Sequence, residues 1–112
     1  MHEMALAESV IQIVEETARK HAAAVRAVWL EIGRLSHVEP EALRFAFDLV
    51  KRDGPARGAR LEIVATDGTA WCMKCSEVVT LARLGDACPR CGSYQLQVTA
   101  GDQMRVKEIE IE

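Results

Sequence analysis

Four cysteines in two close pairs are the residues of this chain with the clearest chemistry. The pairs are Cys72-Met-Lys-Cys75 and Cys88-Pro-Arg-Cys91; the chain has no other cysteine, and twelve residues separate them. One Cys-x-x-Cys pair holds a metal ion from one side, so two facing pairs form a closed tetrahedral thiolate site that suits Zn²⁺. Gly92 follows the second pair and fits the tight backbone turn that such a pair needs. These residues therefore predict a structural zinc site.

A pair of disulfides is the competing interpretation of the four cysteines, with redox chemistry as a related one. Disulfides persist in oxidising compartments. The chain begins Met1-His2-Glu3-Met4, and this acidic start lacks the basic stretch and apolar run of an export signal. We therefore expect a cytoplasmic protein with bound zinc. Four thiolates leave no open coordination position for water or substrate, so we expect the zinc to support the fold and not to catalyse.

The segment that contains the cysteines is poor in large apolar side chains. Between residues 71 and 94 the main candidates for a core are Val78, Val79, Leu81 and Leu84. So small a core is expected to depend on its metal, because a metal-binding free energy of roughly 10 kcal/mol or more becomes folding free energy. Removing one cysteine should therefore unfold this part of the chain.

Composition excludes several classes of protein. Hydrophobic residues at 49% and charged residues at 28% indicate an ordinary globular protein, and 112 residues make one small domain or one domain with a metal-stabilised appendage. No apolar run approaches the ~20 residues of a membrane span, so we expect no membrane partner. We find no Gly-rich phosphate loop and no Ser or Cys nucleophile paired with a base. The chain is therefore not expected to be an enzyme.

The charge pattern disfavours a nucleic-acid partner. The formal net charge is −3, whereas zinc ribbons that bind nucleic acid normally carry a basic face. Near the cysteine pairs, the basic side chains of Lys74, Arg83 and Arg90 are offset by the acidic ones of Glu77 and Asp86.

Hydrophobic periodicity predicts an α+β fold, with a small three-stranded sheet, two helices on one face of it and an inserted zinc-ribbon-like lobe. The elements that we expect are a helix at 4–20, a strand at 25–32 ended by Gly33, a helix from Pro40 to Arg52 ended by Asp53-Gly54-Pro55, a strand at 59–64 and a last strand after Gly101-Asp102. Ser36 to Glu39 resembles a capping box for the second helix. In the last strand the apolar phase shifts at Lys107-Glu108, which predicts a bulge there.

The same pattern divides the chain into two predicted domains. One covers residues 1–65 and is completed by the returning strand at 102–112, and the other covers the cysteine-containing residues 66–101.

The N-terminal residues form a second potential metal site, of a different kind. The α-amine of Met1, the amide nitrogen of His2 and its imidazole Nδ1 can close fused rings around one ion. Ni²⁺ and Cu²⁺ favour such tetragonal nitrogen sites. The amide of Glu3, or a residue from elsewhere, would complete the plane. A histidine at position two is usually just a solvated terminal residue, so this pattern alone carries little weight.

The order of several separate segments adds a family resemblance. They are Met1 to Met4, Val28 to Gly33, Val38 to Leu43, Phe45 to Phe47, Gly58 to Ile63, both cysteine pairs and Gly101 to Val106. With these segments the whole chain resembles the HypA/HybF family of nickel metallochaperones, which take part in the maturation of [NiFe]-hydrogenases.

The resemblance implies two metal sites and several partners. It implies that Ni(II) binds at the N-terminus, with His2 indispensable, Met1 and nearby backbone amides as further ligands, and Glu3 as an acidic neighbour that shapes partner contact or nickel delivery. It also implies that Zn(II) is bound by four cysteines, which are Cys72, Cys75, Cys88 and Cys91. The implied partners are a HypB-type GTPase, the hydrogenase large-subunit precursor and, in some members, urease maturation proteins. Dimers, including domain-swapped ones, occur in the family.

Two other histidines have simpler interpretations. His21 follows the charged end of the first helix and is expected to be solvated or to interact with the helix C-terminus. His37 lies in the loop before the second helix, where solvation is favoured over an approach to His2. Two rival functions remain, a zinc-ribbon nucleic-acid or transcription adaptor and a purely structural interaction module. Nickel binding by a protein with a free native N-terminus distinguishes the metallochaperone from both.

Overall fold

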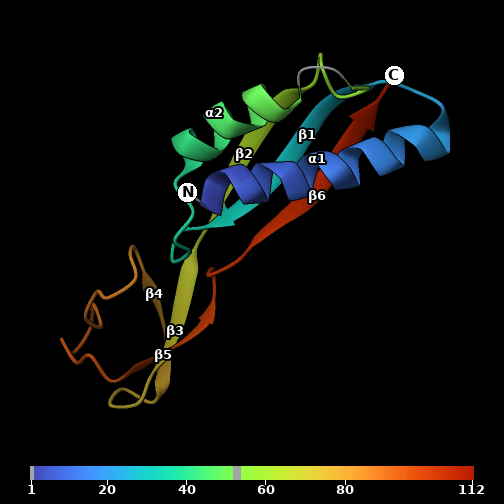
Figure 1. The fold of residues 1–112 in the computed structure, drawn as a ribbon. Coiled ribbons are helices and arrows are strands. Elements are labelled where there is room, and N and C mark those ends of the chain that lie inside the picture. The colour runs from blue at the N-terminus through green and yellow to red at the C-terminus, as the bar shows by residue number, and fades with distance from the viewer. Residues whose placement is uncertain (1, 52–53) are drawn as a thin grey trace. The chain divides into compact units, whose positions relative to one another are not determined.

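The computed structural model describes residues 2–51 and 54–112 and has the predicted α+β architecture (Figure 1). One three-stranded sheet has the order β2-β1-β6 and a second has the order β4-β3-β5. The elements in chain order are α1 (His2–His21), β1 (Val25–Gly33), α2 (Pro40–Val50), β2 (Arg60–Thr66), β3 (Gly68–Cys72), β4 (Glu77–Leu81), β5 (Leu96–Ala100) and β6 (Met104–Ile111). The first sheet with its two helices and the inserted cysteine-containing lobe confirm the predicted fold class.

The chain forms two compact units. We call the first the helical unit; it comprises Met1–Leu30, Val38–Ile63 and Val106–Glu112. The second, the cysteine unit, comprises Glu31–His37 and Val64–Arg105. The assignment of a nickel-binding function to residues 1–65 with 102–112, and of a zinc-binding function to 66–101, stays a prediction.

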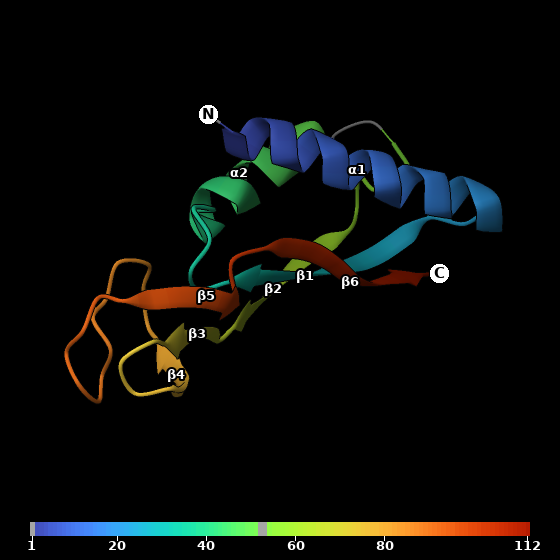
Figure 2. The same cartoon turned by 90° about the horizontal axis from the view of Figure 1, so that it is seen from below.

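In the helical unit, α1 and α2 lie on the same face of the sheet, as Figure 2 shows. The helix predicted at 4–20 is confirmed, and its buried apolar residues form a stripe of Ala7, Val10, Ile11, Val14 and Ala18. From α2, the side chains of Leu43, Ala46 and Phe47 are buried. Each large side chain buried in this way contributes about 1.5–3 kcal/mol to the stability of the fold.

Strand β1 is more buried than a half-buried strand would be. Its residues Ala27, Val28 and Leu30 are all fully buried, although they do not share one phase of the strand. The reason is position, because β1 is the central strand of the β2-β1-β6 sheet. Small Ala27 fits on the face opposite to Val28 and Leu30.

The start of α2 differs from the predicted capping box. The N-cap is Glu39, whose carboxylate accepts the backbone N–H of Glu41 at 3.2 Å. Ser36 instead donates its hydroxyl to the carbonyl of Gly33 at 2.8 Å. The helix begins at Pro40, which has no N–H to offer and is favoured in a first turn. Glu39 therefore takes the capping position that the pattern had given to Ser36. The predicted helix end at Arg52 and Asp53 lies outside the described residues.

The cysteine unit contains a sheet that periodicity did not predict. Strand β3 is central and antiparallel to β4 and β5, with Trp71 opposite Val78 and Gln97. Alternation along β4 buries Val79 and Leu81 and leaves Val78 58% exposed. Leu84, in the loop after β4, is 48% exposed. The prediction that Val78 and Leu84 belong to the core was therefore wrong.

The missing part of that core comes from elsewhere in the chain. Leu35 is 1% exposed and packs with Ala70, Val79, Leu81 and the buried cysteines, while Leu96 and Val98 of β5 pack at the edge. Leu35 lies between β1 and α2, far from the other members in sequence. The cysteine unit thus has a larger apolar core than its own segment suggested.

A close approach of two glycines joins chain segments inside the cysteine unit. A Cβ atom added to Gly33 would collide with the carbonyl oxygen of Gly101, and Gly101 itself has φ +87°. The backbone N–H of Leu35 donates to that carbonyl at 2.8 Å, and the N–H of Gly33 donates to Gln103 at 2.9 Å. Gly33 is therefore the last residue of β1 and a contact point rather than a simple strand breaker.

Along β6 the burial pattern alternates only in the first half. Met104 and Val106 are half-buried, Lys107 and Glu108 are both exposed, and Ile109, Glu110 and Ile111 are all half-buried, so the bulge at Lys107-Glu108 stays a prediction.

Candidate metal centres

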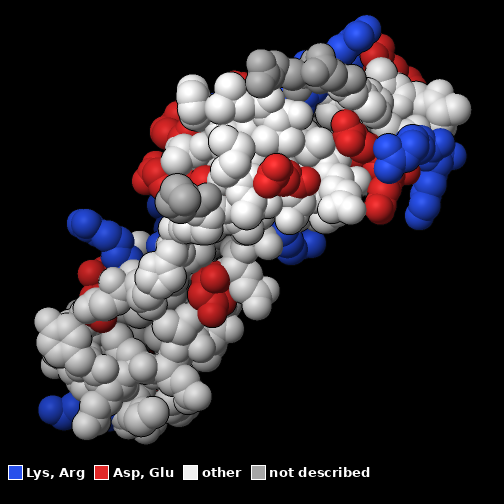
Figure 3. Space-filling model, in the orientation of Figure 1, with Lys and Arg blue, Asp and Glu red and all other residues white. Residues whose placement is uncertain are grey.

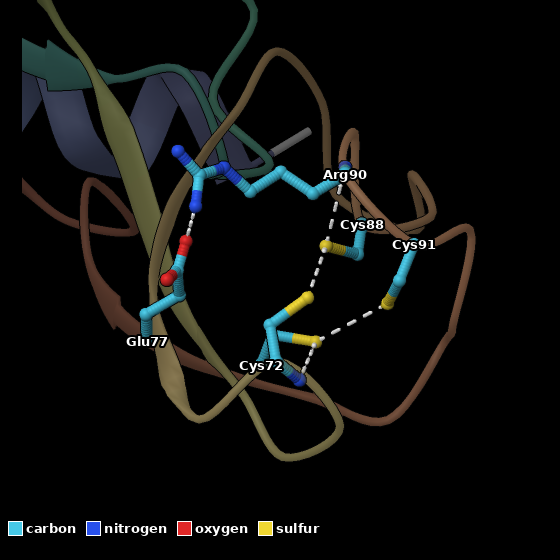
Figure 4. Close-up of polar contacts among 6 residues, drawn as sticks. Cys72, Glu77, Cys88, Arg90 and Cys91 are labelled. Atoms are coloured by element: carbon cyan, nitrogen blue, oxygen red, sulfur yellow. Dashed lines mark hydrogen bonds and ion pairs between the residues drawn. The ribbon is translucent and has the colours of Figure 1, made fainter.

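The four cysteine sulfurs converge on one point in the cysteine unit. All four Sγ atoms lie within 4.8 Å of one another, with 3.6 Å between Cys72 and Cys91 and 3.9 Å between Cys75 and Cys88. Figure 4 shows the labelled sulfurs pointing toward one another. A tetrahedral ion with bonds of about 2.3 Å to sulfur needs sulfur separations of about 3.8 Å. The donor set and spacing therefore fit Zn²⁺.

Each cysteine pair forms the same turn. In the first pair the N–H of Ser76 donates to the carbonyl of Cys72 at 2.8 Å, and in the second the N–H of Gly92 donates to Cys88 at 2.9 Å. Both residues have positive φ, +55° for Ser76 and +76° for Gly92. The turn predicted at Gly92 is confirmed. The same turn at Ser76 was not predicted, because serine rarely adopts a left-handed conformation. The position of Ser76 directly after a Cys-x-x-Cys pair, which matches that of Gly92, was the signal that could have indicated it.

Backbone N–H groups also point at the sulfurs. The N–H of Cys75 lies 3.3 Å from Sγ of Cys72, and the N–H of Arg90 lies 3.4 Å from Sγ of Cys88. Such donors stabilise thiolate charge and orient the sulfur toward a metal. Beside them, the guanidinium of Arg90 forms an ion pair with Glu77 (Figure 4). Both side chains are largely exposed, so this pair contributes little to stability.

Two of the thiols, those of Cys75 and Cys88, differ in acidity. Burial raises the pKa of Cys88, but the backbone N–H groups of Cys91 and Arg90 outweigh it, and the pKa falls from 9.0 to about 7. The neighbouring thiol of Cys91, followed by burial, raises the pKa of Cys75 to about 12. In this fold about half of the Cys88 thiols are therefore ionised at pH 7 before any metal arrives, whereas Cys75 needs the metal in order to lose its proton.

The predicted nickel residues lie in the first turn of α1, in the helical unit. His2 is the first described residue of this helix, and its side chain is 55% exposed. Its Nε2 lies 3.3 Å from a carboxylate oxygen of Glu3, whose side chain is only 12% exposed. Met1, the third predicted residue, lies outside the described residues. The amides of His2 and Glu3 stand before the intrahelical hydrogen-bond ladder begins.

The carboxylate of Glu3 has a partner that the sequence did not reveal. It accepts the backbone N–H of Glu39 at 3.1 Å, across 36 positions of the chain. This hydrogen bond lowers the pKa of Glu3, against the opposing effect of burial. An apolar recess of about 400 Å³ lies beside this carboxylate and is lined by Glu3, Met4, Ala42, Phe45 and Ala46.

The remaining histidines are exposed. His21 contacts the carbonyl of Thr17 through Nδ1 at 3.0 Å, which agrees with an interaction at the C-terminal end of α1. His37 is exposed in the loop before α2. Within residues 2–51 and 54–112, the cysteines are the only set of three or more His, Cys, Asp or Glu residues placed to hold a metal.

Comparison with known proteins identifies the family. The family model described as "Hydrogenase/urease nickel incorporation, metallochaperone, hypA" matches residues 1–111. The chain belongs to this family. It is therefore a member of the HypA nickel metallochaperones of hydrogenase maturation, and its resemblance to them in sequence is confirmed.

Relatives and solved structures agree with this assignment. The chain is 62% identical to the hydrogenase maturation factor HypA of Albidiferax ferrireducens, with all of both chains covered, and 62% identical to that of Rhodopseudomonas palustris strain BisB5 over the same coverage. The solution structure of the Ni metallochaperone HypA from Helicobacter pylori is similar, with a TM-score of 0.69 and 29% identity over 99% of this chain and 97% of that one. A second solution structure of a HypA protein has a TM-score of 0.74 at 29% identity, covering 100% and 97%.

The surface charges and the apolar character of the helices concern two further kinds of partner, nucleic acid and membranes. On the face shown in Figure 3, acidic and basic side chains are interspersed, which is not the continuous basic patch of a nucleic-acid-binding protein. Among the helices that the structure describes, none is long and apolar enough to cross a membrane.

Proposed function

We propose that this protein captures Ni(II) at its N-terminus and delivers it to the large-subunit precursor of a [NiFe]-hydrogenase. The observation that carries the proposal is the open first turn of α1, where the His2 side chain is 55% exposed. The proposed ligands are the α-amine of Met1, the amide and Nδ1 of His2, and the amide of Glu3. Three or four nitrogens in one plane suit Ni²⁺.

An open site of this kind favours transfer over storage. Consecutive residues at a chain end can leave the ion one at a time, so an acceptor can replace them by ligand exchange. An apolar recess lined by Glu3, Met4 and Phe45 lies at this end of the helix and would offer an acceptor a contact surface. Nickel binding should weaken in mild acid, because a protonated imidazole has no lone pair for the metal.

The proposal includes a resident Zn(II) bound by Cys72, Cys75, Cys88 and Cys91. When bound, this ion supplies a permanent cross-link between β3 and the loop before β5, and no catalytic step. We also propose a cytoplasmic location, since four reduced thiols converge on one point and reducing compartments preserve such thiols.

The proposed partners follow the family resemblance. A HypB-type GTPase would assist nickel delivery, the hydrogenase large-subunit precursor would receive the ion, and urease maturation proteins are a second outlet. A homodimer is the proposed higher oligomeric state. We propose no reaction catalysed by the protein itself. Transfer of nickel from the loaded protein to purified precursor, with and without the GTPase, tests these assignments directly.

The decisive experiment is a nickel titration of untagged protein with a native N-terminus. His2→Ala should abolish stoichiometric nickel binding and leave one zinc per chain. His21→Ala is the matched control, because this exposed histidine lies at the other end of the same helix. One extra residue before Met1 should mimic His2→Ala, since it moves the amine away. Unchanged nickel binding by His2→Ala would refute the proposal.

A further inference from the structure

The contact between His2 and Glu3 is unusual for two neighbours on a helix. Successive helical residues point about 100° apart and normally do not face each other. Here the imidazole Nε2 lies 3.3 Å from Oε2 of Glu3, a charge contact just beyond the 2.7–3.2 Å of an ordinary N–H···O hydrogen bond. The histidine ring therefore turns back over the first turn of α1 to reach the carboxylate.

The carboxylate is held in place from a second direction. The same oxygen, Oε2, accepts the backbone N–H of Glu39 at 3.1 Å. Glu39 is the N-cap of α2, so its own backbone is fixed by the start of that helix. The Glu3 side chain is largely buried, and a negative charge is stabilised in the first turn of a helix. Glu3 is thus a preorganised acceptor, whereas the ring of His2 is half in solvent.

This arrangement selects one form of the imidazole. A neutral imidazole carries its hydrogen on one ring nitrogen and a lone pair on the other, and an ionised carboxylate only accepts hydrogen bonds. If the two atoms close by a few tenths of an ångström into a hydrogen bond, Nε2 must carry the hydrogen, which leaves the lone pair on Nδ1. Nδ1 is the nitrogen that can close a ring with the amide of the same residue.

We propose that Glu3 is a positioning residue whose carboxylate stays off the metal and holds His2 in the tautomer with hydrogen on Nε2. The inference rests on the proposed capture of nickel by His2 and adds the reason why an acidic neighbour follows it. Metal-binding histidines commonly donate their second N–H to a carboxylate, which fixes the ring and strengthens the ligand. Nothing in this role requires a bond between nickel and the Glu3 side chain.

The first test uses metal-free protein and needs no nickel. The ¹⁵N chemical shifts of the His2 ring, measured where the imidazole is neutral, report which nitrogen carries the hydrogen. The native protein should show almost only the Nε2–H form. Glu3→Ala should shift the ring toward the mixture of a free imidazole, and Glu3→Gln, which keeps an acceptor oxygen without the charge, should fall between them. Glu8→Ala, which removes an exposed carboxylate of the same helix, should change nothing.

The second test measures nickel affinity in the same variants. Loss of a carboxylate that orients a metal-binding histidine typically costs 10–100-fold in affinity, so Glu3→Ala should weaken nickel binding by about that factor and Glu3→Gln by less. Helix content of each variant, measured by circular dichroism, shows whether α1 is intact. If α1 is lost in Glu3→Ala, the Glu3→Gln result decides.

The outcomes separate this inference from the proposed function. An unchanged His2 tautomer in a folded variant overturns the role of Glu3, even if nickel affinity falls. A changed tautomer with unchanged nickel affinity also overturns it, because the orientation would then not serve the metal. If the native protein binds no nickel at all, the proposed function fails. The inference that Glu3 positions His2 for nickel then fails as well, whichever tautomer is found.

Discussion

The cysteine cluster and the first turn of α1 differ in how their candidate metal ligands are connected along the chain. The cluster draws four sulfurs from β3, the turn after it and the loop before β5, and two of the four cysteines, Cys72 and Cys88, are buried. The first turn offers consecutive residues of one helix, with His2 half in solvent. A cage built from distant parts of the chain opens only when the unit unfolds, whereas neighbours at a chain end can leave one at a time. The proposed lifetimes of the two metals follow from this difference in connectivity.

The largest effect is expected from opening the cage. Cys72→Ser should remove zinc and unfold the cysteine unit, because a structural zinc contributes roughly 10 kcal/mol or more to folding. The α1–α2 core should persist, so stoichiometric nickel binding through His2 should survive. Zinc content, nickel titration and amide NMR spectra measure the three quantities.

Met73→Ala is the matched control for that variant. Met73 follows Cys72 directly and is 57% exposed, so its replacement should leave zinc and fold intact. Loss of both metals from Cys72→Ser would contradict the separation of the two sites.

A smaller effect is expected from the core around the cage. Leu35→Ala should destabilise the zinc-bound cysteine unit by about 2–5 kcal/mol, the usual cost of a buried Leu→Ala cavity. Leu84→Ala, at a position 48% exposed, should cost far less. Denaturant unfolding followed by tryptophan fluorescence in a Trp29→Phe background, where only Trp71 emits, compares the two. Equal losses would show that Leu35 does not belong to this core.

The smallest effect concerns protons at the cage. Zinc binding needs four thiolates, and wherever the cysteine unit keeps its fold without metal the pKa of Cys88 is about 7. Above pH 8 this thiol has already lost its proton, so zinc binding should release one proton fewer there than below pH 6. Below pH 7 each further drop of one pH unit should therefore lower the apparent zinc affinity by up to about tenfold more than the same drop does above pH 8. A pH-indicator assay during zinc addition counts the protons; equal counts at pH 6 and pH 8 would contradict the assigned acidity.

Local patterns predicted what depends on local structure. The stripe of α1 and the turn at Gly92 follow from helical periodicity and from the geometry of a Cys-x-x-Cys pair. Tertiary partners were out of reach, because Leu35 joins a core far away in sequence and Glu3 meets an N–H 36 positions later. The cap of α2 went to Glu39 because Pro40 fixes where the helix starts. Val78 was misplaced because an unpredicted strand decides which of two neighbouring valines faces inward.

The close approach of Gly33 and Gly101 has a consequence for how this chain tolerates substitution. Any side chain at Gly33 would collide with the Gly101 carbonyl, and Gly101 holds a conformation that other residues rarely adopt. In a saturation mutagenesis screen, both positions should be as intolerant as the four cysteines, although neither touches a metal. Such a screen would then mark six residues as intolerant of substitution. Four of them are the cysteines, and the other two are glycines that are needed only because neighbouring backbone atoms leave no room for a side chain.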